Sequence, residues 1–419
     1  MAKQLFSNYK QDIIRAEYIH VQPMSILNLN SVNKKTTFQV DIGDNFCSSE
    51  FQYYITGEYK HADDTKNYGP NSNVKLVDNF VGQLFSHIEV KKHNKLIDEI
   101  EFPGIVGIAK GAVSYTGTTI TNGATKNSGF SSIFSGGGKF AVVGKLGDLG
   151  LGIFSDLNVP IYKGGLEISF TRNTDNDVLY RWKSLKDDRT YDDGSLPHTG
   201  KVEITEFLLR VPVIEYEENS RITIINELTK LNLQYMFRSW QCIQQRNISG
   251  KTLNIDVTNI YRNVDNPVFA IVCFQKNRSN DQLKDNSGFD HSNVKNLHFE
   301  INSKRYPEEY LNLDFLNNNF CIAYEMYQNN YKKIFSKSDS IPFYTPEIFK
   351  DNKALYCVDL SRQPVNISGY KNKIKLHVEF HKSIEAPTGL SEGTICYIIM
   401  ISNVSFVHDI LRNSIKDDV

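Results

Sequence analysis

Apolar residues take every second position along much of the chain. Between residues 373 and 382, apolar side chains alternate with charged or polar ones throughout, and the same period recurs at residues 166–170 and 253–257. Because successive side chains of a strand point to opposite faces, this pattern predicts half-buried strands. Residues 268–274 and 395–401 are instead apolar at nearly every position, which is typical of strands covered on both faces.

The alternation changes phase within residues 202–213. Val202 and Ile204 follow one phase, whereas the apolar residues from Phe207 onward follow the other. One extra residue in the strand produces such a slip and turns the following side chains to the opposite face. We therefore predict a β-bulge around residues 205–206.

Helical periodicity is scarce and short. Four segments have apolar residues three to four positions apart, at residues 78–85, 103–113, 224–231 and 322–334. Glycine in the first two lowers their helix propensity. The chain is therefore predicted to be all-β, with a few short helices in its connections. Antiparallel sheets of many short strands close into sandwiches or barrels, since a single half-exposed sheet leaves open edges.

The two halves of the chain carry similar strand pairs. HIEV at residues 87–90 and HFEI at residues 298–301 lie 211 residues apart, and a turn with a lysine follows each. The later segments 164–174 and 372–383 share a strand phase at a similar offset. A duplicated β-domain of about 200 residues, with its joint near residues 212–218, fits these matches.

Composition limits the class of protein. The chain has 419 residues, 40% of them hydrophobic, with 47 Lys and Arg against 48 Asp and Glu. A net charge of −1 excludes a surface that is polycationic throughout, although a local basic face stays possible. No apolar run approaches the about 18 residues that a transmembrane helix needs, and the N-terminus lacks a signal-peptide pattern. We expect a soluble, folded protein that is made and used inside a cell.

The cysteines point to a reducing compartment. They are scattered without a CxxC pair, and four of them lie inside apolar strings. We interpret them as small buried hydrophobic residues. The six are Cys47, Cys242, Cys273, Cys321, Cys357 and Cys396.

No motif for catalysis, a cofactor or a metal stands out. GGGK at residues 136–139 fails the spacing of a phosphate loop, and Phe140 follows where Ser or Thr is needed. Residues 147–154 lack the third glycine of a dinucleotide fingerprint and a βαβ context. A nucleophile elbow and an HExxH motif are absent. We therefore assign no catalytic residue, cofactor or metal and expect a protein that is not an enzyme, although an enzyme on a β-scaffold is unsupported rather than excluded.

Three polar groups have a simpler interpretation than a site. His377 and His381 share a strand face but lie about 13 Å apart along it, too far to share a metal without a third element. The aspartates within residues 187–193 lack the ligand spacing of a calcium loop and are interpreted as a solvated acidic loop. The basic group at residues 91–95 is interpreted as a hairpin turn in water rather than a nucleic-acid patch.

A longer series of motifs carries a family resemblance. The second half contains FRSW at residues 237–240, then FQKNRSNDQLKDNSGFDHSNVKNLHFEINSKRYPEEYLNLDF at residues 274–315, and AYEMY at residues 323–327. The first half contains VDNFVGQLFSHIEVKKHNKLIDEIE at residues 77–101. These segments resemble the major capsid proteins of the polinton and adintovirus group of eukaryotic DNA viruses and virus-like elements. The match covers most of the chain and is strongest from residue 237 to residue 327.

The resemblance implies a double jelly-roll fold and a role in a shell. Two tandem eight-stranded antiparallel jelly rolls are expected at residues 17–215 and 216–419, after an N-terminal arm at residues 1–16. Homotrimers with a pseudo-sixfold outline would tile an icosahedral capsid around a DNA genome. The implied partners are further copies of the chain, a single-jelly-roll penton protein and other virion proteins, with no specific nucleic-acid site. The implied location is the virion, after synthesis in the host cytosol.

Arms and loops are the adjustable parts of such a subunit. We expect residues 1–16 to lie on the inner side of the shell and to order against neighbouring subunits. The Gly-, Ser- and Thr-rich segment at residues 114–138 and the charged segment at residues 183–200 are expected to be surface loops. The first of these loops is predicted to face outward or to contact a neighbouring trimer.

The main alternative is a β-sandwich module that binds glycans for attachment. Such a module should concentrate aromatic residues in its loops, whereas Trp182 and Trp240 adjoin strand patterns. A jelly-roll hydrolase should show a cluster of histidines or carboxylates, and none is evident in the sequence. We therefore favour the structural capsid subunit.

Overall fold

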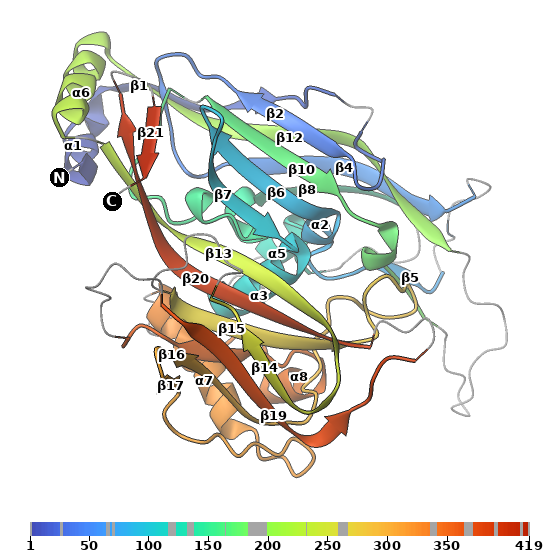
Figure 1. The fold of residues 1–419 in the computed structure, drawn as a ribbon. Helices are drawn as coiled ribbons and strands as arrows, with labels where there is room; N and C mark the ends of the chain where they lie inside the picture. The colour runs from blue at the N-terminus through green and yellow to red at the C-terminus, as the bar shows by residue number, and fades with distance from the viewer. Residues whose placement is uncertain are drawn as a thin grey trace.

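The chain folds as two β-sandwiches that lie side by side, with helices in their connections (Figure 1). The structure is a computed structural model. It describes residues 2–25, 28–63, 68, 72–115, 123–131, 138–163, 165–182, 199–231, 233–258, 267–335, 342–363, 372–388, 393–410 and 414–417.

The first sandwich consists of two antiparallel sheets, ordered β1-β12-β4-β8 and β2-β10-β6-β7. The first sheet contains β1 (Ile13–Val21), β12 (Gly200–Tyr216), β4 (Gln52–His61) and β8 (Gly138–Lys145). The second contains β2 (Lys35–Val40), β10 (Leu166–Arg172), β6 (Phe85–Lys92) and β7 (Lys95–Glu101). Four short strands supplement them: β3 (Phe46–Cys47), β9 (Ile161–Tyr162), β5 (Val74–Leu76) and β11 (Leu179–Arg181).

The second sandwich has sheets ordered β13-β20-β15-β18 and β14-β19-β16-β17. The first of these contains β13 (Leu233–Ile248), β20 (Thr394–Asp409), β15 (Pro267–Lys276) and β18 (Tyr356–Asp359). The other contains β14 (Gly250–Asp256), β19 (Ile374–Ile384), β16 (Val294–Ile301) and β17 (Lys304–Tyr306). A ninth strand, β21 (Ser414–Asp417), pairs with the far end of β20.

The two sandwiches share one strand order, which is that of an eight-stranded jelly roll. In chain order, the first strand of each forms the outer edge of one sheet and pairs with the long last strand. The hairpins that the sequence match identified also turn alike. His93 and Asn94 have φ of 50° and 63°, and Asn302 and Ser303 have φ of 50° and 67°. Positive φ at both turn positions suits the twist of an antiparallel pair. The predicted tandem jelly rolls are therefore confirmed.

Local sequence signals account for several strand features. The register of β12 against β4 shifts between Ile204 and Glu206, so the predicted bulge is confirmed. The predicted strand at residues 373–382 is β19, whose apolar positions are buried in alternation. β15 and the first nine residues of β20 are buried almost throughout, as expected for strands covered on both faces.

Most helices lie in connections between strands. The segments at 103–113 and 322–334 form α3 (Pro103–Ser114) and α7 (Cys321–Phe335). The helix expected at 224–231 begins earlier, as α6 (Glu218–Leu231), and the one expected at 78–85 is only α2 (Phe80–Gln83) because β6 already begins at Phe85. The other helical segments were not predicted: α1 (Ala2–Asn8), α5 (Ala124–Asn127), α8 (Pro346–Asn352), and the 3-10 turns η1 (Lys10–Asp12), η2 (Leu146–Leu149), η3 (Gly152–Phe154) and η4 (Asp175–Asp177).

Candidate assembly surfaces

The two jelly rolls meet along β13 of the second roll. This strand packs against β7 and η3 of the first roll, and α3 of the first roll packs against α7 of the second. Gly152 in η3 lies so close to the carbonyl group of Arg238 that a Cβ atom at this position would overlap the carbonyl oxygen. Only glycine therefore permits this approach of the two backbones.

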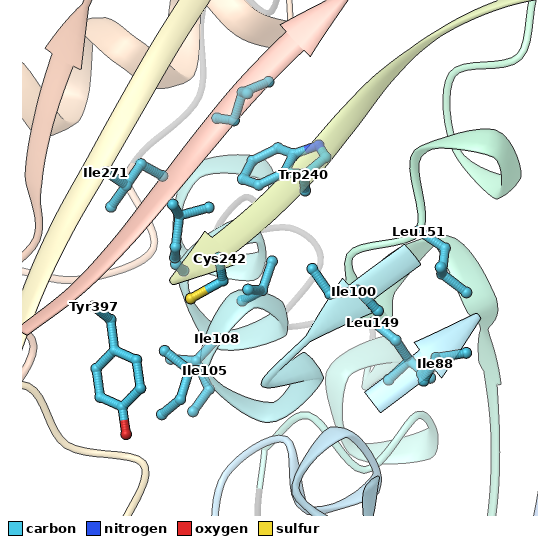
Figure 2. Close-up of a cluster of buried hydrophobic side chains, with 14 of the residues drawn as sticks. Ile88, Ile100, Ile105, Ile108, Leu149, Leu151, Trp240, Cys242, Ile271 and Tyr397 are labelled. Atoms are coloured by element: carbon cyan, nitrogen blue, oxygen red, sulfur yellow. The ribbon is translucent and has the colours of Figure 1, made fainter. Parts of the chain in front are cut away.

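Figure 2 shows the apolar core of this joint. The first roll contributes side chains from β6, β7, α3 and the segment after β8, and the second contributes side chains from β13, β15 and β20. The labelled residues are Ile88, Ile100, Ile105, Ile108, Leu149, Leu151, Trp240, Cys242, Ile271 and Tyr397, all of them buried. At its margin the Phe102 ring meets the Tyr397 ring edge to face, with centroids 5.7 Å apart. One continuous core therefore joins the rolls, and burial of its apolar surface is the main force that holds them together.

A buried carboxylate links the two rolls within this core. Asp98 of β7 accepts a hydrogen bond from the Ser239 hydroxyl of β13 (Oγ to Oδ1, 3.1 Å) and another from the backbone N–H of Ile153 (3.1 Å). Burial raises the pKa of Asp98 to about 7, against the effect of these hydrogen bonds and of the nearby Lys110. The protonation state of this carboxyl therefore changes near neutral pH.

A buried lysine lies beside it. The ammonium of Lys110, in α3, donates to the Gly147 carbonyl (2.7 Å) and the Ser155 hydroxyl (2.6 Å) and lies 5.2 Å from the centroid of a Trp240 ring. Burial lowers the pKa of Lys110, while neighbouring carboxylates oppose that shift. Sequence reasoning did not find Asp98 or Lys110. The available signal was the position of Lys110 inside an otherwise apolar helix, where a charge must find partners.

Ion pairs and amide hydrogen bonds surround the apolar part of the joint. The guanidinium of Arg238 binds the Asp156 carboxylate through two hydrogen bonds of 3.0 Å. Gln282 of the second roll accepts from the Gly200 N–H (2.9 Å) and donates to the Gly200 carbonyl (2.7 Å). Two further ion pairs cross the joint, Lys353 with Asp78 (3.3 Å) and Lys75 with Asp285 (3.4 Å). This polar rim fixes the rotation of one roll against the other.

The polar groups considered from the sequence do not form a site. His377 contacts Asn254 and stacks on His298, whereas His381 contacts the Leu313 carbonyl. In the part of the chain that the structure describes, no three His, Cys, Asp or Glu side chains are placed to hold a metal ion. The acidic loop at residues 187–193 lies outside the described residues. The structure also places no helix among those it describes that is long and apolar enough to cross a membrane.

The Gly-rich and basic segments have structural roles. Gly138 and Lys139 begin β8 and pair with β4, so no helix follows the GGGK run as a phosphate loop requires. The basic group at residues 91–95 is a hairpin turn, as predicted, but Lys92 does not lie in water. Its ammonium donates to the Tyr162 carbonyl (3.0 Å), and burial lowers its pKa to about 8.

Five of the six cysteines are buried, as predicted. Cys321 is exposed, so the prediction is wrong there, because this residue begins α7 and its side chain points away from the core. Burial raises the pKa of Cys47 to about 12 and raises that of Cys273 too, which keeps these thiols protonated and unreactive.

The N-terminal segment packs against its own chain over its described part. α1 contacts α6, and Phe6 is buried with its ring 5.4 Å from that of Phe46. β1 begins at Ile13, earlier than the strand expected from residue 17. Residues 13–16 thus belong to a sheet of the first jelly roll rather than to an arm. Contact of residues 1–16 with a neighbouring subunit stays a prediction.

The two predicted loops are only partly described. Within residues 114–138, the described segment 123–131 is exposed at residues 124, 126 and 127, whereas Phe130 is buried against Tyr115 (ring centroids 4.8 Å) and Phe343 (5.5 Å). The segment therefore lies at the surface and is anchored there by one buried aromatic side chain. Residues 116–122 and 132–137, and nearly all of 183–200, lie outside the described residues.

Comparison with known proteins gives consistent results. A family model described as the double jelly roll-like domain matches residues 74–404. The fold is similar to the Faustovirus major capsid protein, with a TM-score of 0.55 and 8% identity over 93% of this chain and 90% of that one. It is also similar to the Sputnik virophage structure, with a TM-score of 0.54 and 10% identity over 97% of this chain and 89% of that one. The PBCV-1 virus capsid gives a TM-score of 0.51 and 10% identity over 94% of each chain. No curated protein sequence matches the chain. At these identities the solved structures establish the fold alone.

Proposed function

The chain belongs to the family of double jelly roll-like domains, and from this premise we propose that it is a major capsid protein. In this proposal its role is structural and not enzymatic. Homotrimers with a pseudo-sixfold outline tile an icosahedral shell around a DNA genome. Assignment to the polinton and adintovirus group rests on the sequence resemblance alone and stays a prediction.

The observation that carries the proposal is the fusion of two jelly rolls of the same strand order into one rigid chain. A shared buried core and a polar rim set their relative orientation. Six jelly rolls from three such chains complete a ring, and six-sided rings tile the faces of an icosahedral shell. The similarity to the Faustovirus and PBCV-1 capsid structures supports the same role.

The finer assignments follow from this role. The first jelly roll begins with β1 at Ile13 rather than at residue 17 and extends to residue 215, and the second takes residues 216–419, with the linking helix α6 at its start. A single-jelly-roll penton protein would fill the fivefold positions that a six-sided tile cannot. The virion is the expected location, after synthesis in the host cytosol.

Size-exclusion chromatography with light scattering tests the proposal. A capsid subunit is expected to elute as a trimer near three times 47.9 kDa, or as larger shells. A stable monomer that binds immobilised glycans would instead support the attachment module. The burial of Trp240 inside the joint already removes that aromatic residue from any glycan-binding loop.

A further inference from the structure

The outer strands β1 and β13 hold the same place in the two jelly rolls. Each is the first strand of its roll in the shared strand order, and each pairs on one side with the long last strand, β12 or β20. The opposite edge strands correspond as well, since β7 in the first roll and β17 in the second each form the last edge of the other sheet. β1 therefore corresponds to β13, and β17 corresponds to β7. The contact that β13 makes with β7 indicates which contact β1 and β17 can make.

The side of β13 that faces away from β20 is covered by the first jelly roll of the same chain. Asn158 of the first roll donates its N–H to the Met236 carbonyl (3.2 Å) and accepts from the Met236 N–H through its side chain (3.0 Å). These bonds satisfy backbone groups on the side of β13 that faces away from β20. β7 packs alongside, with Asp98 bound to Ser239. The pair β13 and β7 is therefore the contact between the first and second rolls.

β1 and the segment beside β17 both carry exposed side chains. In β1 the five residues from Ile14 to Tyr18 are exposed, and among the described residues no strand pairs with its outer side. The Ile14 side chain is 67% exposed. Beside β17, Tyr310 is 65% exposed and its ring stacks under the Arg305 guanidinium at 3.8 Å. An open strand edge with exposed apolar side chains is a template for pairing, which proteins cover by assembly or by other protection.

We propose that the outer side of β1 docks against the β17 side of the second jelly roll of another copy of this chain, repeating between chains the contact that β13 and β7 make within one. This inference rests on the proposed trimer and names its contact surfaces. The contact is heterologous, because a first roll meets a second roll, and such contacts form a closed ring when the rotation between units closes. Around a ring of three chains, the β13–β7 contact within each chain would then alternate with the β1–β17 contact between neighbouring chains.

The test uses charge substitutions on each side of the contact in the full-length chain. Ile14→Asp alters the β1 side, and Tyr310→Asp alters the β17 side. Ile348→Asp is the matched control, since this residue is also exposed (43%) but lies on α8. Each interface variant is expected to raise the dissociation constant of the trimer by about tenfold or more, whereas the control keeps the wild-type value.

Mixing the two interface variants sharpens the test. The Tyr310 variant keeps an intact β1, and the β1 variant keeps an intact β17 side, so one contact between the two variants can form. Dimers are therefore expected, whereas closed trimers, which need three intact contacts, are not. Trimers of normal stability in the β1 variant would overturn this inference and leave the capsid proposal standing. A wild-type chain that stays monomeric would overturn both.

Cross-linking gives a second readout that does not depend on weakened assembly. A photoreactive phenylalanine analogue in place of Ile14, which is 67% exposed, is expected to cross-link, between isotopically distinct copies, to peptides that contain β17 or Tyr310. A cross-link from this position into the first jelly roll of the other copy would contradict the proposed contact.

Discussion

β13 and β1 occupy the same place in two jelly rolls of one strand order, but their surroundings differ. β13 carries large aromatic side chains that are buried against the other roll, among them Tyr235, Phe237 and Trp240. β1 is exposed from Ile14 to Tyr18. The strand order therefore defines the shape of each roll, whereas the side chains on its first strand determine whether that strand is buried within the chain or left available to another one.

The largest expected loss of stability comes from a substitution on the buried strand, β13. Trp240→Ala removes a fully buried indole from the joint and should lower the free energy of unfolding by about 3–5 kcal/mol. Trp182→Ala is the matched control, because Trp182 is only half-buried and should cost clearly less. Chemical denaturation of both variants measures the difference. Equal losses would contradict a joint that is held by its apolar core.

The second prediction concerns pH. Because the pKa of Asp98 is about 7 in the folded chain and about 3.9 in an unfolded one, the folded state binds an extra proton between these values. The contribution of this group to stability therefore increases as pH falls through about 7 and levels off below about 4.

The measurement is the free energy of unfolding at several pH values between about 8 and about 5 in the wild type and in Asp98→Asn. The wild type should gain up to about 1.4 kcal/mol per pH unit from this group relative to the variant. Parallel pH profiles would show that Asp98 does not titrate in the joint.

A smaller effect is expected at the polar rim. Arg238→Ala breaks a two-bond ion pair in which both side chains are largely buried, and should cost about 1–2 kcal/mol. Lys145→Ala removes an exposed pair with Glu50 and should leave stability unchanged within error. Thermal unfolding distinguishes the two, and a neutral Arg238→Ala variant would show that the rim adds nothing to the joint.

The smallest effect is expected on β1. Ile14→Ser should change the unfolding free energy of the isolated chain by less than about 0.5 kcal/mol, because Ile14 is mainly exposed. Phe237→Ser on β13 should instead destabilise the chain strongly, since its side chain is buried. Similar losses for the two variants would remove the contrast between the two strands.

Much of the fold could be predicted from local patterns. The bulge between Ile204 and Glu206 and the alternation of β19 depend only on neighbouring residues, and so they appear in the sequence. α8 also had a readable start, since Thr345 caps it by accepting a hydrogen bond from the Ile348 N–H (3.4 Å) and Pro346 follows.

The joint could not be predicted in the same way. The hydrogen bonds of Asp98 connect segments that lie 55 and 141 residues apart in the chain, so no local pattern announces them. The inward packing of Phe130 and the burial of Lys92 likewise depend on partners from distant segments. Sequence reasoning thus located the two jelly rolls and missed the contacts that orient one against the other.

Electron microscopy of purified assemblies tests the central claim most directly. We predict closed shells whose faces are tiled by six-sided units, each built from three copies of the chain with two jelly rolls apiece. Isolated particles of a single chain at all concentrations, with no six-sided unit, would contradict the account.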